Sequence, residues 1–148
     1  MAAQLAGPDA DRLRPALTDL GLDVDPPGPL IYVRLGGTTM ADLEDTLTSW
    51  FLDAQAAASD NRDVVTVISD ELVDGDDVAG CALGHALISG TRAWAMERNR
   101  EGNIGNVVVA CPEELTGAAA TVAWLIESRA VSGEVLHAGR RRHGRQRL

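Results

Sequence analysis

The chain has 148 residues, enough for one domain that buries about two-thirds of its unfolded surface without disulfides or metals. Its formal charge is −9, its thirteen basic residues are all arginine, and no apolar run approaches the roughly 20 residues of a membrane span. These values exclude a membrane-spanning protein, and charge repulsion excludes nucleic-acid binding by anything except a basic terminus.

The first part of the chain predicts a helix, a strand and a second helix. Leucines recur on one helical face over Asp9–Leu20. The run Leu30–Leu35 is β-branched and aromatic and is followed by two glycines, as at the end of a strand. Thr39, placed three residues before an aspartate, resembles a capping box at the start of an amphipathic helix over Asp42–Ala58.

The second part alternates strands and helices. Val64–Ile68 is β-branched throughout, as in a buried parallel strand. A helix rich in glycine and alanine is expected over Val78–Arg98, and a strand over Ile104–Ala110. A helix beginning at Pro112 and a last strand over Gly133–His137 complete the chain. This alternation predicts βαβ units with four strands in a parallel sheet.

Charge is concentrated at the end of the chain. Residues 140–148 carry five arginines, so residues 1–139 hold eight arginines against twenty-two acids, a net charge of −14. We expect residues 1–139 to form the single domain and residues 140–148 a basic tail, which is solvated or straps onto an acidic neighbour.

Four segments of the second half follow one another in a characteristic order: Ala86–Glu97, Ile104–Ala110, Ala123–Leu125 and Val131–His137. Together they resemble the rear half of the short-chain dehydrogenase/reductase family, and the resemblance extends over about Asp63–Gly139. It implies an α/β fold: a reduced, Rossmann-like, three-layer domain with a short, mostly parallel sheet of about four strands. It also implies that the chain begins after the family's first three strands.

The chain departs from the family where catalysis would occur. In the register of the resemblance, the catalytic Tyr and Lys fall near Gly80 and Gly84, and Ser69 is the only local match to the catalytic Ser. The family's Asn-containing strand end corresponds to Arg34–Gly37, and no Gly-x-x-x-Gly-x-Gly or Gly-x-Gly-x-x-Gly phosphate turn occurs. The substrate-covering segment is reduced to Cys111–Glu114. We therefore expect no cofactor and no independent catalysis.

The resemblance also implies an interface. In the family, the helices matching Asp42–Ala58 and Val78–Arg98 form a four-helix dimer interface, and small residues on the second helix would let another backbone approach. The partner would be a second copy of the chain or a complete short-chain reductase. The candidate contact residues are Leu47, Trp50, Phe51, Gly80, Gly84, Leu87 and Trp94.

Three functions are compatible with these features. The first is a non-catalytic scaffold or pseudo-subunit that oligomerises with itself or with a complete reductase. The second is an oxidoreductase subunit that adds substrate contacts to a partner's NAD(P)-dependent site. The third is a small-molecule binding protein that uses the carboxyl end of its sheet near Gly36, Ser69 and Cys111.

Further features favour structural explanations. The acidic stretch Asp70–Asp77 lacks the ligand spacing of an EF-hand and indicates a solvated loop. Cys81 and His85 lie one helical turn apart, but with no third ligand nearby they indicate packed core rather than a metal site. The apolar environment of Cys81 and Cys111 argues against disulfides and predicts a cytoplasmic protein.

One edge of the predicted sheet needs a cover. Without the family's first strands, Leu30–Leu35 or Val64–Ile68 would have an unpaired side. Because an uncovered apolar edge promotes aggregation, we expect Met1–Leu20, a second copy or a partner chain to lie over it.

Overall fold

The computed structural model describes residues 1–24, 27–37 and 39–139. Five parallel strands form one sheet in the order β1-β2-β3-β4-β5, so the strand order follows the chain. The strands are β1 (Gln4–Ala6), β2 (Leu30–Arg34), β3 (Val64–Ser69), β4 (Gly105–Ala110) and β5 (Val135–Ala138). The helices are α1 (Ala10–Asp19), α2 (Met40–Ser59), α3 (Glu71–Asp74), α4 (Val78–Arg98), η1 (Asn99–Glu101) and α5 (Thr116–Ser128).

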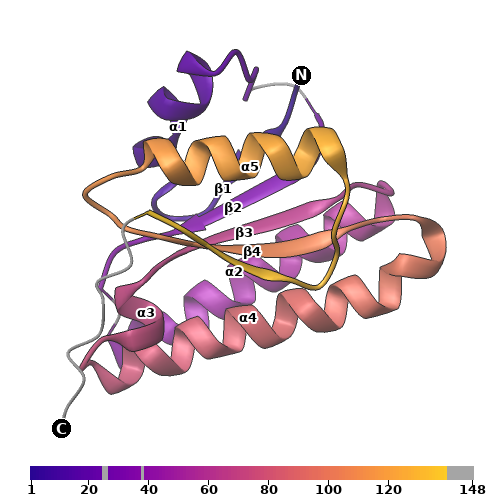
Figure 1. Ribbon diagram of the computed structural model, residues 1–148. Helices are drawn as coiled ribbons and strands as arrows, with labels where there is room; N and C mark the ends of the chain where they lie inside the picture. Colours follow the sequence, from indigo (N-terminus) through magenta and orange to yellow (C-terminus); the bar gives the residue numbers. More distant parts are fainter. Residues whose placement is uncertain (25–26, 38, 140–148) are drawn as a thin grey trace, which may run out of the picture.

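Helices cover both faces of the sheet, which gives three layers (Figure 1). Helices α1 and α5 lie on one face, and α2, α3 and α4 lie on the other (Figure 1). The α/β, Rossmann-like fold class is therefore confirmed, with five strands in place of about four. The basic tail at residues 140–148 lies outside the described residues.

Strand β1 is the main addition to the predicted elements. It pairs in parallel with β2, with Gln4 opposite Leu30 and Ala6 opposite Tyr32. Of the three covers expected for this edge, the structure shows the Met1–Leu20 segment, whereas the expectation that no strand precedes the first helix is wrong. The start of α5 is also corrected, because Pro112 lies in a turn closed by a hydrogen bond from the Glu114 amide to the Cys111 carbonyl.

Each face of the sheet carries its own apolar core. Leu13 and Leu17 of α1 and Val122 of α5 are completely buried on one face. On the other face, Trp50 of α2 and Trp94 of α4 are almost completely buried. Both indoles find hydrogen-bond acceptors, because the Trp50 ring N–H donates to the Thr66 hydroxyl at 3.1 Å and the Trp94 ring N–H to the Ala54 carbonyl at 3.1 Å. The Trp50 hydrogen bond therefore joins α2 to β3, and the Trp94 hydrogen bond joins α4 to α2.

The glycines of α4 are explained within the chain itself. A Cβ atom added at Gly84 would lie 1.9 Å from the Leu72 carbonyl oxygen, and one at Gly80 would lie 3.3 Å from a Leu72 methyl group. Helix α3 therefore packs against the glycine positions of α4. The small residues of α4 predict that another backbone approaches this helix closely. In the structure, that backbone belongs to α3 of the same chain.

The crossovers have an unusual arrangement. Every crossover steps to the next strand in the same direction, but α1 and α5 run over one face while α2 and α4 run over the other. The two pairs of crossovers must then have opposite handedness, so one pair has the left-handed form that βαβ units rarely adopt. The path of the chain changes face at β2, which lies between α1 and α2, and again at β4, which lies between α4 and α5.

Candidate functional site

Two crevices are expected at the carboxyl edge of this sheet. In parallel α/β sheets, ligands bind outside the carboxyl ends of neighbouring strands whose following segments turn to opposite faces. That condition holds between β1 and β2, and again between β3 and β4. The residues after these four strands are therefore the candidates for contact with a ligand.

The crevice between β1 and β2 holds a carboxylate of the chain itself. Asp9 follows β1, and its Oδ2 atom accepts hydrogen bonds from the backbone N–H groups of Leu35 at 2.7 Å and Gly36 at 3.0 Å. Gly7, with a φ of +97°, lets the turn before Asp9 approach the Val33 backbone. The two amides at the end of β2 are thus occupied by an anionic group supplied by the chain.

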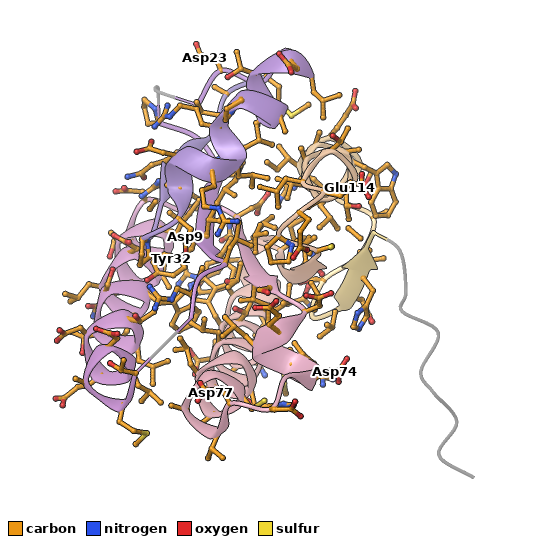
Figure 2. The ribbon with its side chains drawn as sticks, turned by 90° about the vertical axis from the view of Figure 1, so that its left-hand side faces the viewer. Asp9, Asp23, Tyr32, Asp74, Asp77 and Glu114 are labelled. Atoms are coloured by element: carbon orange, nitrogen blue, oxygen red, sulfur yellow. The ribbon has the colours of Figure 1, made fainter. Side chains whose placement is uncertain are left out.

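Tyr32, the one tyrosine of the chain, lies below this crevice. Its ring is completely buried near Asp9 (Figure 2), and its hydroxyl donates to the Thr46 carbonyl at 3.2 Å. Burial raises the pKa of the Tyr32 phenol, so this group stays protonated at neutral pH. The chain has no lysine, and the hydrogen bond with Ser49 and the charge of Arg34 lower the Tyr32 pKa by less than burial raises it.

A cavity of about 530 Å³ lies at the crevice between β1 and β2. Its walls come from the β1–α1 turn, the end of β2 and the first turns of α2. The lining residues are Pro8, Arg34, Gly37, Asp42, Asp45, Thr46 and Ser49. A volume of this size lies within the usual range for small-molecule sites, roughly 300 to 1,000 Å³.

The crevice between β3 and β4 presents Ser69 and Cys111, two of the three residues predicted near a ligand. Ser69 is completely buried, and its hydroxyl accepts a hydrogen bond from the Glu71 backbone N–H at 3.1 Å, which holds α3 in place. The Cys111 thiol donates to the Glu113 carboxylate at 2.9 Å, and this hydrogen bond raises the pKa of the thiol. Gly36 lies in the other crevice, so the three predicted residues do not form one site.

Glu113 should therefore suppress the reactivity of Cys111. We expect Glu113→Gln, in a Cys81→Ser background, to speed alkylation of Cys111 by iodoacetamide several-fold at neutral pH, because loss of the carboxylate lowers the thiol pKa and increases the thiolate fraction. Alkylation rates measured between pH 7 and 10 should show the midpoint moving to lower pH. Unchanged rates would contradict the assignment of Glu113 as the group that holds the proton on sulfur.

The acidic stretch Asp70–Asp77 is more structured than a solvated loop. It contains α3, and the Asp77 carboxylate caps α4 by accepting from the Gly80 backbone N–H at 2.6 Å (Figure 2). The Cys81 thiol donates to the Gly75 carbonyl at 3.2 Å, while His85 is exposed, which corrects its assignment to the packed core. Across residues 1–24, 27–37 and 39–139, no group of three His, Cys, Asp or Glu side chains could hold a metal ion.

Most of the predicted contact residues on α2 and α4 are buried within the chain. These are Trp50, Gly80, Gly84, Leu87 and Trp94, which leave little surface for a partner to contact. Leu47 is partly buried against the same core, and Phe51 is 58% exposed. The apolar side chains that these two helices do expose are Met40, Phe51, Leu52, Val78 and Met96. The oligomer itself stays a prediction.

In the part of the chain that the structure describes, no helix has both the length and the apolar character needed to cross a bilayer. No family model matches the chain, and no curated protein matches its sequence. Solved structures with the same fold do match. The TT0495 protein of Thermus thermophilus aligns over 92% of this chain and 97% of that chain, with a TM-score of 0.67 and 16% identity.

Two named oxidoreductases are also similar in structure. Acetoin dehydrogenase from Enterobacter cloacae has a TM-score of 0.61 and 17% identity, over 88% of this chain and 68% of that chain. Enoyl-[acyl-carrier-protein] reductase (NADH) from Aquifex aeolicus has a TM-score of 0.57 and 19% identity, over 87% of this chain and 67% of that chain. These are oxidoreductases of the short-chain dehydrogenase/reductase type, and at such identities the likeness establishes the fold alone.

Proposed function

We propose that this chain is a non-catalytic protein of the short-chain dehydrogenase/reductase type, acting as a scaffold or pseudo-subunit that oligomerises with itself or with a complete reductase. The observation that carries the proposal is the position of Asp9. A dinucleotide places its pyrophosphate at the N-terminus of the helix that follows the first strand of such a sheet. Here Asp9 stands at the N-terminus of that helix, α1, where its carboxylate, held by the amides of Leu35 and Gly36, would repel the phosphates.

The catalytic groups support the same conclusion. Gly80 and Gly84 stand where the family's Tyr and Lys would fall, and the packing of α3 leaves no room for a side chain at Gly84. The buried hydroxyl of Ser69 accepts a hydrogen bond from the first residue of α3, Glu71. We also propose that residues 1–139 act as one reduced domain beside the basic tail, in the cytoplasm, where the free thiols of Cys81 and Cys111 would persist.

The first test is cofactor binding by the isolated chain. Calorimetry with NADH and NADPH should give no saturable heat, and no carbonyl reduction should follow. Micromolar binding of either dinucleotide would overturn the proposal. The alternative function, an oxidoreductase subunit, requires a partner that supplies the nucleotide site. It would be favoured if a full-length reductase co-purified with the chain and lost substrate selectivity when the chain was removed.

The second test concerns the oligomer. Helix α2 exposes Phe51, and α4 exposes Met96 beside the small residues Ala82, Ser89 and Ala93, which would let another helix approach closely. We expect Phe51→Glu to weaken self-association at least about tenfold, because a charge would be buried against an apolar surface.

Sedimentation of the wild type and the variant measures this effect. Ala56→Glu introduces the same charge at an exposed position about 140° around α2 from Phe51 and serves as the matched control. A wild type that is strictly monomeric, both alone and with a co-purifying reductase, would contradict the proposed oligomer.

A further inference from the structure

Helix α5 presents a tryptophan to solvent. The side chain of Trp124 is 46% exposed. Gly117, Thr121 and Ser128 lie on the same face of α5, because successive members of this set are three or four residues apart. We call Gly117, Thr121, Trp124 and Ser128 the α5 row. Its other side chains are small, so a segment of chain that lies along the row would contact the indole directly.

The basic tail begins beside the first residue of this row. Gly139, which precedes the tail, packs against Gly117, since a Cβ atom built on Gly117 would lie 3.7 Å from the Gly139 backbone nitrogen. Trp124 follows Gly117 by seven residues, which is about 10 Å along the helix. The nine residues 140–148 span up to roughly 30 Å when extended. The tail is therefore long enough to reach every residue of the α5 row.

The charges of the tail and of the α5 row are opposite. Residues 140–148 carry five arginines, whereas residues 112–128 include three glutamates and no basic residue. The Glu114 carboxylate flanks the start of the row, with its Oε1 atom 3.9 Å from a Cβ atom built on Gly117. Glu127 is exposed and follows Trp124 by one helical turn. The row thus offers an indole face, which attracts guanidinium groups, between two carboxylates.

We propose that the basic tail docks along the α5 row of its own chain, with arginines stacked on Trp124 and paired with Glu114 and Glu127. Each such contact is weak at a surface, but the tether gives the tail a high effective concentration at the row. The docked tail shields the exposed indole beside β5, the last strand of the sheet, from contact with other chains. This inference goes beyond the proposed function, whose oligomer uses α2 and α4.

Acrylamide quenching of tryptophan fluorescence tests the contact, because Trp50 and Trp94 are only 7% and 8% exposed and are quenched little. In the full chain, the quenching constant should rise about twofold when the tail loses its charge and leaves the indole. The neutral variant replaces by Gln the residues Arg140, Arg141, Arg142, Arg145 and Arg147. About 1 M NaCl should give the same rise in the wild type, because salt screens exposed charges. Trp124→Phe should abolish both changes.

The receiving glutamates provide the matched control. Glu114→Gln with Glu127→Gln should raise the quenching constant, whereas Glu44→Gln with Glu97→Gln, the same charge change at exposed positions of α2 and α4, should not. Equal effects of the two pairs would overturn the inference, as would a constant that neither salt nor the arginine variant changes. A constant that rises on dilution from about 100 to about 1 μM would show that a second copy covers Trp124, and this too would overturn it. The proposed function fails on different readouts, namely NADH binding and sedimentation.

Discussion

Gly84→Ala should lower the free energy of unfolding by about 3 kcal/mol, because the added methyl group has nowhere to go. Its Cβ atom would lie 1.9 Å from the Leu72 carbonyl oxygen and 2.7 Å from the carbonyl carbon. These are backbone atoms, so no rotamer change relieves the collision. Helix α3 would have to move off α4 and take the buried Leu72 side chain out of the core. Urea unfolding followed by circular dichroism measures the loss.

Gly37→Ala is the matched control for this substitution. A Cβ atom at Gly37 would meet nothing within 4 Å, so we expect that variant to stay within about 0.5 kcal/mol of the wild type. A Gly84→Ala protein as stable as the control would contradict the packing of α3 on α4. That result would also favour the interpretation from the sequence, in which the glycines of α4 face another chain.

Periodicity was sufficient to predict most of the elements. The runs at β2, β3 and β4 are rich in β-branched residues, and the helices over α1, α2 and α4 follow their apolar spacing closely. Strand β1 could not be recognised, because its three residues, Gln-Leu-Ala, include no β-branched or aromatic side chain. It becomes a strand because β2 offers an edge and Gly7 permits the turn that follows.

The packing of the short helix α3 on α4 could not be predicted from the periodicity of the sequence. The glycines of α4 correctly indicated that a backbone approaches, but not whose backbone it is. Helix α3 has four residues within an acidic stretch, and Leu72 is the one that is buried. An interface with another chain was therefore the natural explanation for Gly80 and Gly84, whereas in the structure both positions pack against Leu72 of the same chain.

The crevice between β1 and β2 could not be predicted from the sequence for a related reason. Asp9 stands just before a helix, where an aspartate usually caps the helix by accepting from its first amides. Its side chain makes no such bond and accepts instead from the amides after β2. That contact exists only because β1 pairs with β2. The faces on which the helices lie are equally absent from the local pattern, so the crevices that they create could not be derived from it.

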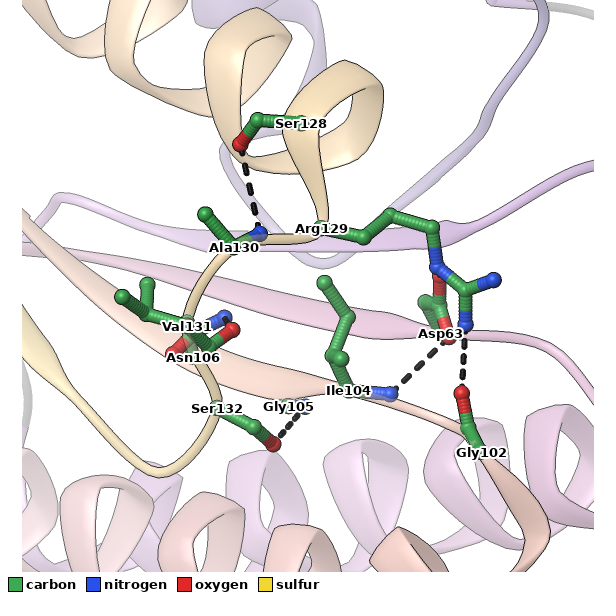
Figure 3. Close-up of polar contacts among 10 residues, drawn as sticks. All are labelled: Asp63, Gly102, Ile104, Gly105, Asn106, Ser128, Arg129, Ala130, Val131 and Ser132. Atoms are coloured by element: carbon green, nitrogen blue, oxygen red, sulfur yellow. Dashed lines mark hydrogen bonds and ion pairs between the residues drawn. The ribbon is translucent and has the colours of Figure 1, made fainter.

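Arg129→Ala should cost about 2 kcal/mol of unfolding free energy, because it leaves a buried carboxylate without its counter-ion. Arg129 follows α5, and its Nε and Nη2 atoms lie 3.0 and 3.1 Å from the two carboxylate oxygens of Asp63 (Figure 3). Asp63 is 7% exposed and also accepts from the Ile104 backbone N–H at 2.9 Å. The pair ties the end of α5 to the amino ends of β3 and β4. Half of the Arg129 side chain is exposed, and solvent weakens the ion pair. We therefore expect a smaller loss of unfolding free energy than the removal of one partner of a fully buried pair would cause.

The backbone of Arg129 provides the control that separates the ion pair from local strain. Its φ is +50°, a conformation that suits glycine better than alanine. Arg129→Gly removes the same guanidinium without that strain, so it should be about 1 kcal/mol less destabilising than Arg129→Ala. Asp63→Asn combined with Arg129→Ala should cost less than the sum of the two single changes, because the unpaired charge disappears. Strict additivity in urea denaturation, together with wild-type stability for Arg129→Gly, would show that the ion pair does not stabilise the fold.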